Sequence, residues 1–181
     1  SVKAVEIVPK AKGFELVRLG VVPLPPEAIV QGAFLNSSAI VDAIREALAS
    51  AGIKATHAAV AVSGHSVIVK KISLPAMTRE ELEESIRWEA EQYIPFDVNE
   101  VNLDFQILSA GSTEGQMDVL LVAAKKDLID DYTNVLGEAG LAAAVIDVAA
   151  FTVENAWEAN YDVPADAVVA LVNVGAQSTN I

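Results

Sequence analysis

The sequence contains no cysteine and only two histidines, His57 and His65. The absence of cysteine excludes disulfide bonds, cysteine-ligated zinc and thiol nucleophiles, and two histidines are too few for a histidine-rich metal site. Basic residues are scarce as well, because 12 Lys and Arg stand against 25 Asp and Glu, which gives a net charge of −13. A chain this acidic repels phosphate backbones and anionic lipid, so we expect no nucleic acid among its partners.

Long apolar runs are also absent. The longest, at 58–62 and 119–124, are far shorter than the roughly 20 residues that cross a bilayer, and the first residues lack the apolar core of a signal peptide. We therefore expect no direct insertion into a membrane. The chain has no initiator methionine and closes on what reads as a strand cut short, so we expect it to be a segment of something longer.

What is present is a composition typical of a folded protein, with 52% apolar and 20% charged residues over 181 positions. Alternating and helical apolar spacings predict an α/β protein with mixed sheets. Residues 67–136 form a self-contained strand, helix, hairpin and helix, which fits a small subdomain inserted into a larger one. The predicted strands are 14–22, 58–62, 67–74, 101–107, 117–124, 145–148 and 168–174, and the predicted helices begin near Ser37 or Ser38, Thr78, Leu128 and Phe151.

Some of these elements carry finer expectations. Ser37 or Ser38 is expected to cap the first helix, and Gly52 to end it. The apolar run at 58–62 is expected to be a strand buried on both faces. Residues 101–107 alternate apolar and polar side chains, which is typical of a sheet with one solvated face, and 117–124 is expected to pair with them as a hairpin.

Trp88 lies in an unusual position on its predicted helix. A capping box of Thr78 and Glu81 begins this helix, Leu82 belongs to its apolar stripe, and Pro95 is expected to end it. Trp88 lies about 120° around the helix from Leu82, away from that stripe. A large aromatic side chain there needs a partner, either a neighbouring subdomain or a separate protein. The many glutamates around it form mostly a solvated face, although they would also attract a peptide that carries Arg or Lys.

The segment 173–179 combines the end of an apolar strand with Gly175, Ser178 and Thr179. A glycine turn allows close approach of the backbone, and hydroxyl and N–H groups can donate to anionic oxygens, so this turn is a candidate phosphate cradle. A simple hairpin turn explains the same residues. The sequence has neither the lysine of a P-loop nor a G-x-G-x-x-G motif.

Catalytic arrangements are poorly supported. His65 lies beside Ser63 and Ser66 in a predicted turn, where adjacent residues seldom reach nucleophile–base geometry, and no orienting acid is evident. The carboxylates at 89 and 91, and those at 130 and 131, have helical spacings that point the two groups apart. We therefore predict no catalytic residue.

Four long strings carry a resemblance to a known family: the segments 1–6, 62–75, 87–97 and 117–131. In them the sequence resembles the PilM family, the actin-like, FtsA-related cytoplasmic proteins of type IV pilus assembly. Family members are longer, and this chain resembles their N-terminal half. The resemblance implies an actin-like (ribonuclease H-like) mixed sheet with an inserted FtsA-type subdomain. It assigns 1–66 and 141–165 to subdomain 1A, 67–140 to the inserted subdomain 1C, and 166–181 to the start of subdomain 2A.

The resemblance also implies that ATP, with Mg²⁺, binds between the two halves of the longer protein. The actin-like pattern usually has Asp at the position of Asn173, and an amide ligates Mg²⁺ poorly, so we expect weak ATP hydrolysis or none. Whether the protein is an enzyme is left open. The nucleotide-binding residues that the resemblance implies are Ser1, Lys3, Gly175, Ser178 and Thr179.

A partner is implied in the same way. The family binds the short cytoplasmic N-terminal tail of PilN in a groove between subdomains 1A and 1C, which would hold the protein at the cytoplasmic side of the inner membrane. Other pilus motor components and a homo-oligomeric ring are further expected partners. The expected contact residues for the PilN tail are Ile86, Trp88, Tyr93, Ile94, Pro95 and Phe96.

Two other functions stay open at this point. An FtsA-like cytoskeletal protein would form head-to-tail filaments with ATP. A phosphotransferase of the sugar-kinase type would share the actin-like core, but it needs a carboxylate base near the phosphate, and Asn173 is not one.

Overall fold

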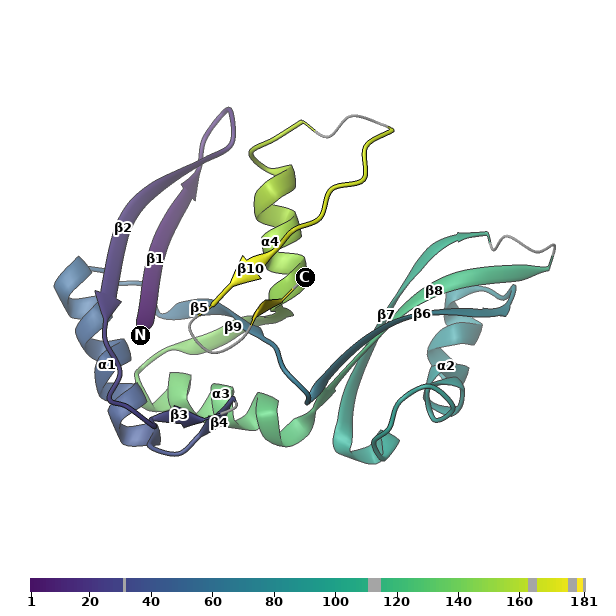
Figure 1. Cartoon of the computed structure of the whole chain (residues 1–181), viewed down its shortest axis with the longest axis horizontal. Helices are drawn as coiled ribbons and strands as arrows, with labels where there is room; N and C mark the ends of the chain where they lie inside the picture. The colour runs from purple at the N-terminus through teal and green to yellow at the C-terminus, as the bar shows by residue number, and fades with distance from the viewer. Residues whose placement is uncertain (31, 111–114, 163–165, 176–178, 181) are drawn as a thin grey trace. The chain divides into compact units, whose positions relative to one another are not determined.

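The computed structural model describes residues 1–30, 32–110, 115–162, 166–175 and 179–180. They form two compact units, one made of residues 1–63 and 131–181 (unit 1) and one made of residues 64–130 (unit 2). Each unit combines helices with its own sheets (Figure 1). The fold class predicted from the sequence, α/β with mixed sheets, is confirmed.

Unit 1 begins with an antiparallel hairpin of β1 (Val2–Pro9) and β2 (Phe14–Val22) that packs on helix α1 (Ser37–Ala51) (Figure 1). The prediction of β2 is confirmed, whereas β1 was not among the predicted elements. The cap prediction is wrong: the side chain of Asn36, not Ser37 or Ser38, accepts a hydrogen bond from the N–H of Ala39 at 3.0 Å. Asn36 leaves both serines inside the helix.

The prediction that Gly52 ends α1 is confirmed. Gly52 follows its last residue in the left-handed conformation, with φ of 69°, and its N–H bonds to the carbonyls of Leu48 and Ala49. Glycine adopts this conformation without the steric cost that a Cβ atom brings.

A close backbone approach fixes how β2 lies on α1. A Cβ atom added at Gly20 would lie 2.2 Å from the carbonyl oxygen of Ala47. Around this contact the side chains are small or β-branched, and Val22, Ala43 and Ala47 form a buried cluster that Val2 partly covers. Only glycine at position 20 allows the strand to come this near the helix.

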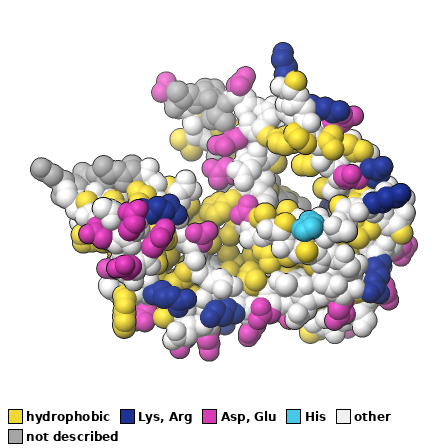
Figure 2. Space-filling view, turned by 180° about the vertical axis from the view of Figure 1, so that it is seen from behind, with side chains coloured by type: hydrophobic (Ala, Val, Ile, Leu, Met, Phe, Trp, Pro, Cys, Tyr) yellow, Lys and Arg dark blue, Asp and Glu magenta, His cyan; other side chains and the backbone are white. Residues whose placement is uncertain are grey.

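The other face of the hairpin is open. Val5 pairs with Leu19, and Ile7 with Leu16, across the two strands, so each pair lies on one face of the hairpin. All four side chains are exposed. The space-filling view shows apolar side chains gathered near the hairpin at its upper right (Figure 2).

A second helix packs against α1 in unit 1. Helix α3 (Lys126–Glu138) places Val135 in a buried cluster with Ile40 and Val41 of α1. The rings of Phe34 and Tyr132 pack with centroids 4.8 Å apart. Two short strands, β3 (Ile29–Val30) and β4 (Ala33–Phe34), pair as a small hairpin beside this cluster.

Unit 1 also contains a parallel pair, β5 (His57–Val62) and β9 (Ala142–Val148), followed by helix α4 (Ala149–Glu158). The expectation that 58–62 is buried on both faces is wrong, because only Val62 in β5 is buried. With only β9 as a partner, β5 in the described part of the chain lacks the layers that bury a central parallel strand.

The last strand is much shorter than predicted. Only Asn173–Val174 of the expected 168–174 forms a strand, β10, which pairs antiparallel with β11 (Thr179–Asn180). Val168 is fully exposed, and no strand among the described residues bonds to 168–172. An apolar run adopts strand structure only where a partner supplies the ladder hydrogen bonds, and none does so among the described residues.

Unit 2 is a three-stranded antiparallel sheet covered on one face by helix α2 (Arg79–Ala90). Strand β8 (Gln116–Lys125) lies between β6 (Val67–Pro75) and β7 (Val101–Ala110), which follows a short 3-10 turn (Val98–Glu100). The predicted hairpin of 101–107 with 117–124 and its one solvated face are confirmed.

Helix α2 begins as the sequence predicts. Thr78 accepts from the N–H of Glu81 at 3.2 Å, and the Glu81 carboxylate accepts from the N–H of Thr78 at 2.7 Å. Leu82 is fully buried against Leu121 and Val119 of the sheet. The helix ends at Ala90, so the prediction that Pro95 ends it is wrong.

The contact at Gly20 gives a stability prediction. Because a Cβ atom would overlap backbone and not a movable side chain, Gly20→Ala is expected to lower the free energy of unfolding by about 1–3 kcal/mol or more. Urea unfolding of the variant and the parent measures it. Gly137 in α3 is the matched control, since its Cβ would meet nothing within 4 Å; Gly137→Ala should stabilise by about 0.5–1 kcal/mol. Equal stability of Gly20→Ala and the parent would contradict the contact.

Candidate functional site

The six residues expected to contact a partner all lie in unit 2, in and just after α2, but they differ in burial. Ile86 and Ile94 are each only 6% exposed and belong to the core cluster under α2. These two side chains therefore pack in the core beneath the exposed side of α2, and in this conformation they do not reach a partner.

Two aromatic residues of the set are half-buried at the edge of that core. Tyr93 and Phe96 pack against the cluster, and each has a lysine over its ring: Lys70 Nζ lies 5.4 Å from the Tyr93 centroid and Lys125 Nζ 4.6 Å from the Phe96 centroid. A cation over an aromatic face is attracted by the ring electrons. The turn after α2 is thus held by packing and by cations that come from the sheet.

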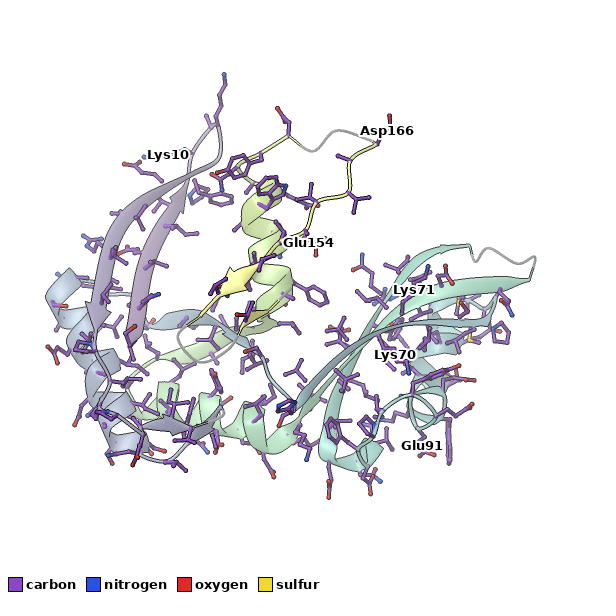
Figure 3. The ribbon with its side chains drawn as sticks, in the orientation of Figure 1. Lys10, Lys70, Lys71, Glu91, Glu154 and Asp166 are labelled. Atoms are coloured by element: carbon purple, nitrogen blue, oxygen red, sulfur yellow. The ribbon has the colours of Figure 1, made fainter. Side chains whose placement is uncertain are left out.

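Trp88 and Pro95 are the exposed members of the set. The Trp88 side chain is 73% exposed, the largest exposure of any aromatic residue in the described part of the chain. Its neighbours one turn before and one turn after on the same side of the helix are Glu84 and Glu91, both exposed. Figure 3 labels Glu91 at the end of α2. We call Glu84, Trp88 and Glu91 the Trp88 ridge.

The uncovered face of the unit 2 sheet carries a polar network that the sequence analysis did not identify. Asp118 is only 7% exposed, and its two carboxylate oxygens accept from Ser73 Oγ at 2.7 Å and from Lys71 Nζ at 2.8 Å. The hydrogen bond from Lys71, and then that from Ser73, hold the pKa of Asp118 below its ordinary value, against the opposing effect of burial. A signal existed in the sequence, because Asp118 is the one charged residue within the apolar run 117–124.

The expected nucleotide-binding residues fall in two places of unit 1. Ser1 and Lys3 are exposed at the start of β1, whereas Gly175 and Thr179 are exposed in the β10–β11 hairpin. These strands belong to separate sheets. Ser178 lies outside the described residues. Val174 pairs with Thr179, and this pairing is compatible both with a simple hairpin turn and with a phosphate cradle.

The described residues show no assembled metal site. Within the described ranges, no group of three or more His, Asp or Glu side chains gathers closely enough to hold a metal ion. Asn173, where an aspartate was expected from the resemblance, offers a neutral oxygen only. For a nucleotide, this segment supplies backbone N–H groups around Gly175 and the Thr179 hydroxyl, which suit phosphate oxygens.

No helix in the part of the chain that the structure describes combines the length and the apolar character needed to span a membrane.

The chain matches the family described as type IV pilus assembly protein PilM over residues 1–181. It is similar to a solved PilM–PilN type IV pilus biogenesis complex, with 36% sequence identity and a TM-score of 0.72 over 82% of this chain and 44% of the other. The chain therefore spans less than half the length of the chain it matches there.

A weaker likeness is to the cytoplasmic domain of EpsL, an inner membrane component of the type II secretion system of Vibrio cholerae. Identity is 19% and the TM-score 0.46, over 78% of this chain and 50% of that one.

The Asp118 network gives a prediction on pH. The folded state lowers the pKa of the Asp118 carboxyl below its ordinary value of 3.8. The ionised carboxylate therefore stabilises the fold above that pH, and this contribution is lost as the pH falls through the folded-state pKa. Lys71→Met should raise the pKa of Asp118, measured by carboxyl ¹³C NMR. Lys70→Met is the control, because Lys70 lies over Tyr93 and not at Asp118. An Asp118 pKa unchanged by Lys71→Met would contradict the assignment.

Proposed function

The chain belongs to the family of type IV pilus assembly protein PilM, and from that premise we propose that it is part of an ATP-binding adaptor of the pilus assembly machine. The adaptor holds the cytoplasmic N-terminal tail of PilN and thereby stays at the cytoplasmic side of the inner membrane. The observation that carries the proposal is the likeness, at 36% identity, to a chain solved in complex with PilN. Two surfaces of the described residues support it.

The first is the Trp88 ridge of unit 2. Exposed tryptophans are rare on surfaces that meet only water, and they are enriched among the residues that dominate binding energy in interfaces. The ridge stands on a rigid base, because Leu82, Ile86 and Ala90 of the same helix are buried in the core. A partner that covers Trp88 would bury its ring without first having to order the helix.

Charge on the ridge agrees with such a partner. Glu84 and Glu91 flank Trp88, and their carboxylates have no hydrogen bond or ion pair within the described part of the chain. Cytoplasmic segments next to membrane-spanning helices carry an excess of Lys and Arg. A tail of that composition would be attracted to the ridge, with its apolar residues on the indole and its cations beside the glutamates.

The second surface is the β10–β11 hairpin of unit 1. Gly175 and Thr179 supply the close backbone approach and the hydroxyl that a phosphate group needs. Because Asn173 carries no charge, ATP acts here as a ligand that is hydrolysed slowly or not at all. Bound ATP would bias closure of the two halves of the longer protein, and this closure would be coupled to tail binding.

Trp88 gives the first test of this function. Titration of a fluorescent PilN tail peptide against full-length protein should show affinity reduced about tenfold or more by Trp88→Ala, since interface tryptophans commonly contribute above 2 kcal/mol. Leu108→Ala, which also truncates an exposed apolar side chain of unit 2, should bind as the parent does. Undiminished affinity of Trp88→Ala would remove the ridge from the proposal.

Thr179 gives the second test. Thr179→Val removes the hydroxyl and keeps the shape, so binding of ATP to full-length protein, measured by calorimetry, should weaken about tenfold, as expected for a lost hydrogen bond to a charged group. Thr56→Val is the matched control in unit 1, because Thr56 is exposed and bonds to His57. If both variants bind ATP as the parent does, the hairpin does not contact the nucleotide.

A further inference from the structure

The chain passes between the two units at two places, and these two crossings differ in structure. Unit 2 begins at Gly64 and ends at Asp130. The first crossing is the segment 63–66, which belongs to no helix or strand. The second crossing lies inside α3, whose residues 126–138 run through the end of unit 2 without a break. One crossing is therefore a turn, and the other is a helix.

The first turn of α3 is anchored in unit 2. Strand β8, the central strand of the unit 2 sheet, ends at Lys125, and α3 begins at the next residue, so no loop separates strand from helix. Lys126 Nζ donates to the carbonyl oxygen of Asn99 at 2.7 Å, and Asn99 lies in the 3-10 turn that precedes β7. The start of the helix is therefore tied to this sheet.

The end of α3 is anchored in unit 1. Val135 is buried in a cluster with Ile40 and Val41 of α1. The guanidinium of Arg45, also in α1, donates to the carbonyl oxygen of Glu138, the last residue of α3. A change in the position of α3 would therefore act directly on α1.

Helix α1 leads on to the expected nucleotide-binding residues at the start of the chain. The close approach of Gly20 to the Ala47 carbonyl fixes the β1–β2 hairpin on α1. Lys3 lies in β1 of this hairpin, and Ser1 precedes it. The contacts thus form a continuous series from the unit 2 sheet through α3 and α1 to β1.

The other crossing is suited to adapt. Gly64 has φ of 101°, a Cβ atom added there would meet nothing within 4 Å, and Ser63 and His65 beside it are exposed. A glycine turn without packed side chains can change its backbone angles at little cost. A helix resists such changes, because bending it sharply disrupts its internal hydrogen bonds.

We propose that α3 carries the coupling between the PilN tail and ATP, and that the turn at 63–66 only adapts to the movement. This inference rests on the proposed function, in which the tail binds unit 2 and ATP binds unit 1. Two sites are coupled through an element whose equilibrium both ligands bias. Helix α3 meets this condition, since its start is tied to the unit 2 sheet and its end to α1.

The experiment weakens α3 at the boundary between the units and leaves both anchors in place. Asp130 and Asp131 are exposed, and glycine at both positions loosens the helix, because only proline is less favourable in a helix interior. The affinity of full-length protein for a fluorescent PilN tail peptide is measured with and without saturating ATP. In the parent the two affinities should differ by about fivefold or more, as is usual for coupled sites. In Asp130→Gly with Asp131→Gly they should be equal, with the parent's affinity in the absence of ATP retained.

Two matched variants separate helix stiffness from other effects. Asp130→Ala with Asp131→Ala removes the same charges but retains the helix, because alanine is the best helix former, so the effect of ATP should persist. Ser63→Gly with His65→Gly loosens the other crossing, and the effect of ATP should persist there too. Circular dichroism checks that each variant folds. If the glycine pair does not fold, Asp131→Gly alone takes its place and should reduce the effect of ATP in part.

The outcomes distinguish this inference from the proposed function. An effect of ATP as large in the glycine variant as in the parent would overturn the role of α3 and leave the proposed function standing. Loss of the effect in the alanine pair, or in Ser63→Gly with His65→Gly, would overturn that role too, because charge or the turn would then be responsible. A parent whose tail affinity does not respond to ATP would contradict the coupling in the proposed function itself, and the role of α3 would fall with it.

Discussion

The approach of β2 to α1 at Gly20 is the constraint on which unit 1 depends. With the Ala47 carbonyl occupying the space of a side chain at position 20, strand and helix can be joined only through small residues such as Ala43 and Ala47. The same helix then uses Ile40 and Val41 to hold α3 through a second cluster. One helix therefore connects the two parts of the unit, and its position is set by a backbone contact that tolerates no added atom.

In unit 2, helix α2 has a buried side and an exposed side that carries Trp88, the proposed contact residue. The buried side of α2 contributes to a core centred on β8, the strand that bonds to both of its neighbours. The capping box fixes where the helix begins, and the cations over Tyr93 and Phe96 hold the turn that follows it. Trp88 is consequently presented on a base that does not need to reorganise, which is the condition for an exposed aromatic side chain to act as an anchor.

Local patterns in the sequence were sufficient for the family, the α/β class, the capping box and the position of Trp88 away from the apolar stripe of its helix, because each depends on residues a few positions apart. The rest depends on long-range pairing. The Ser73–Asp118 bond joins residues 45 positions apart and exists only in one strand register. The failure of 168–172 to form a strand reflects the lack of a partner strand in the described chain, which apolar character cannot reveal. Ile86 and Ile94 were expected to contact a partner, but they are buried. The apolar spacing of a helix shows which side faces the core, and it does not show how completely each side chain on that side is covered.

The apolar pairs on the open face of the β1–β2 hairpin have a consequence for handling a polypeptide of these 181 residues. Its net charge of −13 makes separate molecules repel each other. Each molecule also has an exposed apolar patch on this hairpin, formed by Val5, Ile7, Leu16 and Leu19, through which two molecules can associate. At low ionic strength the repulsion dominates, but at about 0.1 M salt it reaches only about 10 Å. Added salt should therefore favour self-association, which should be stronger at physiological ionic strength than at low ionic strength.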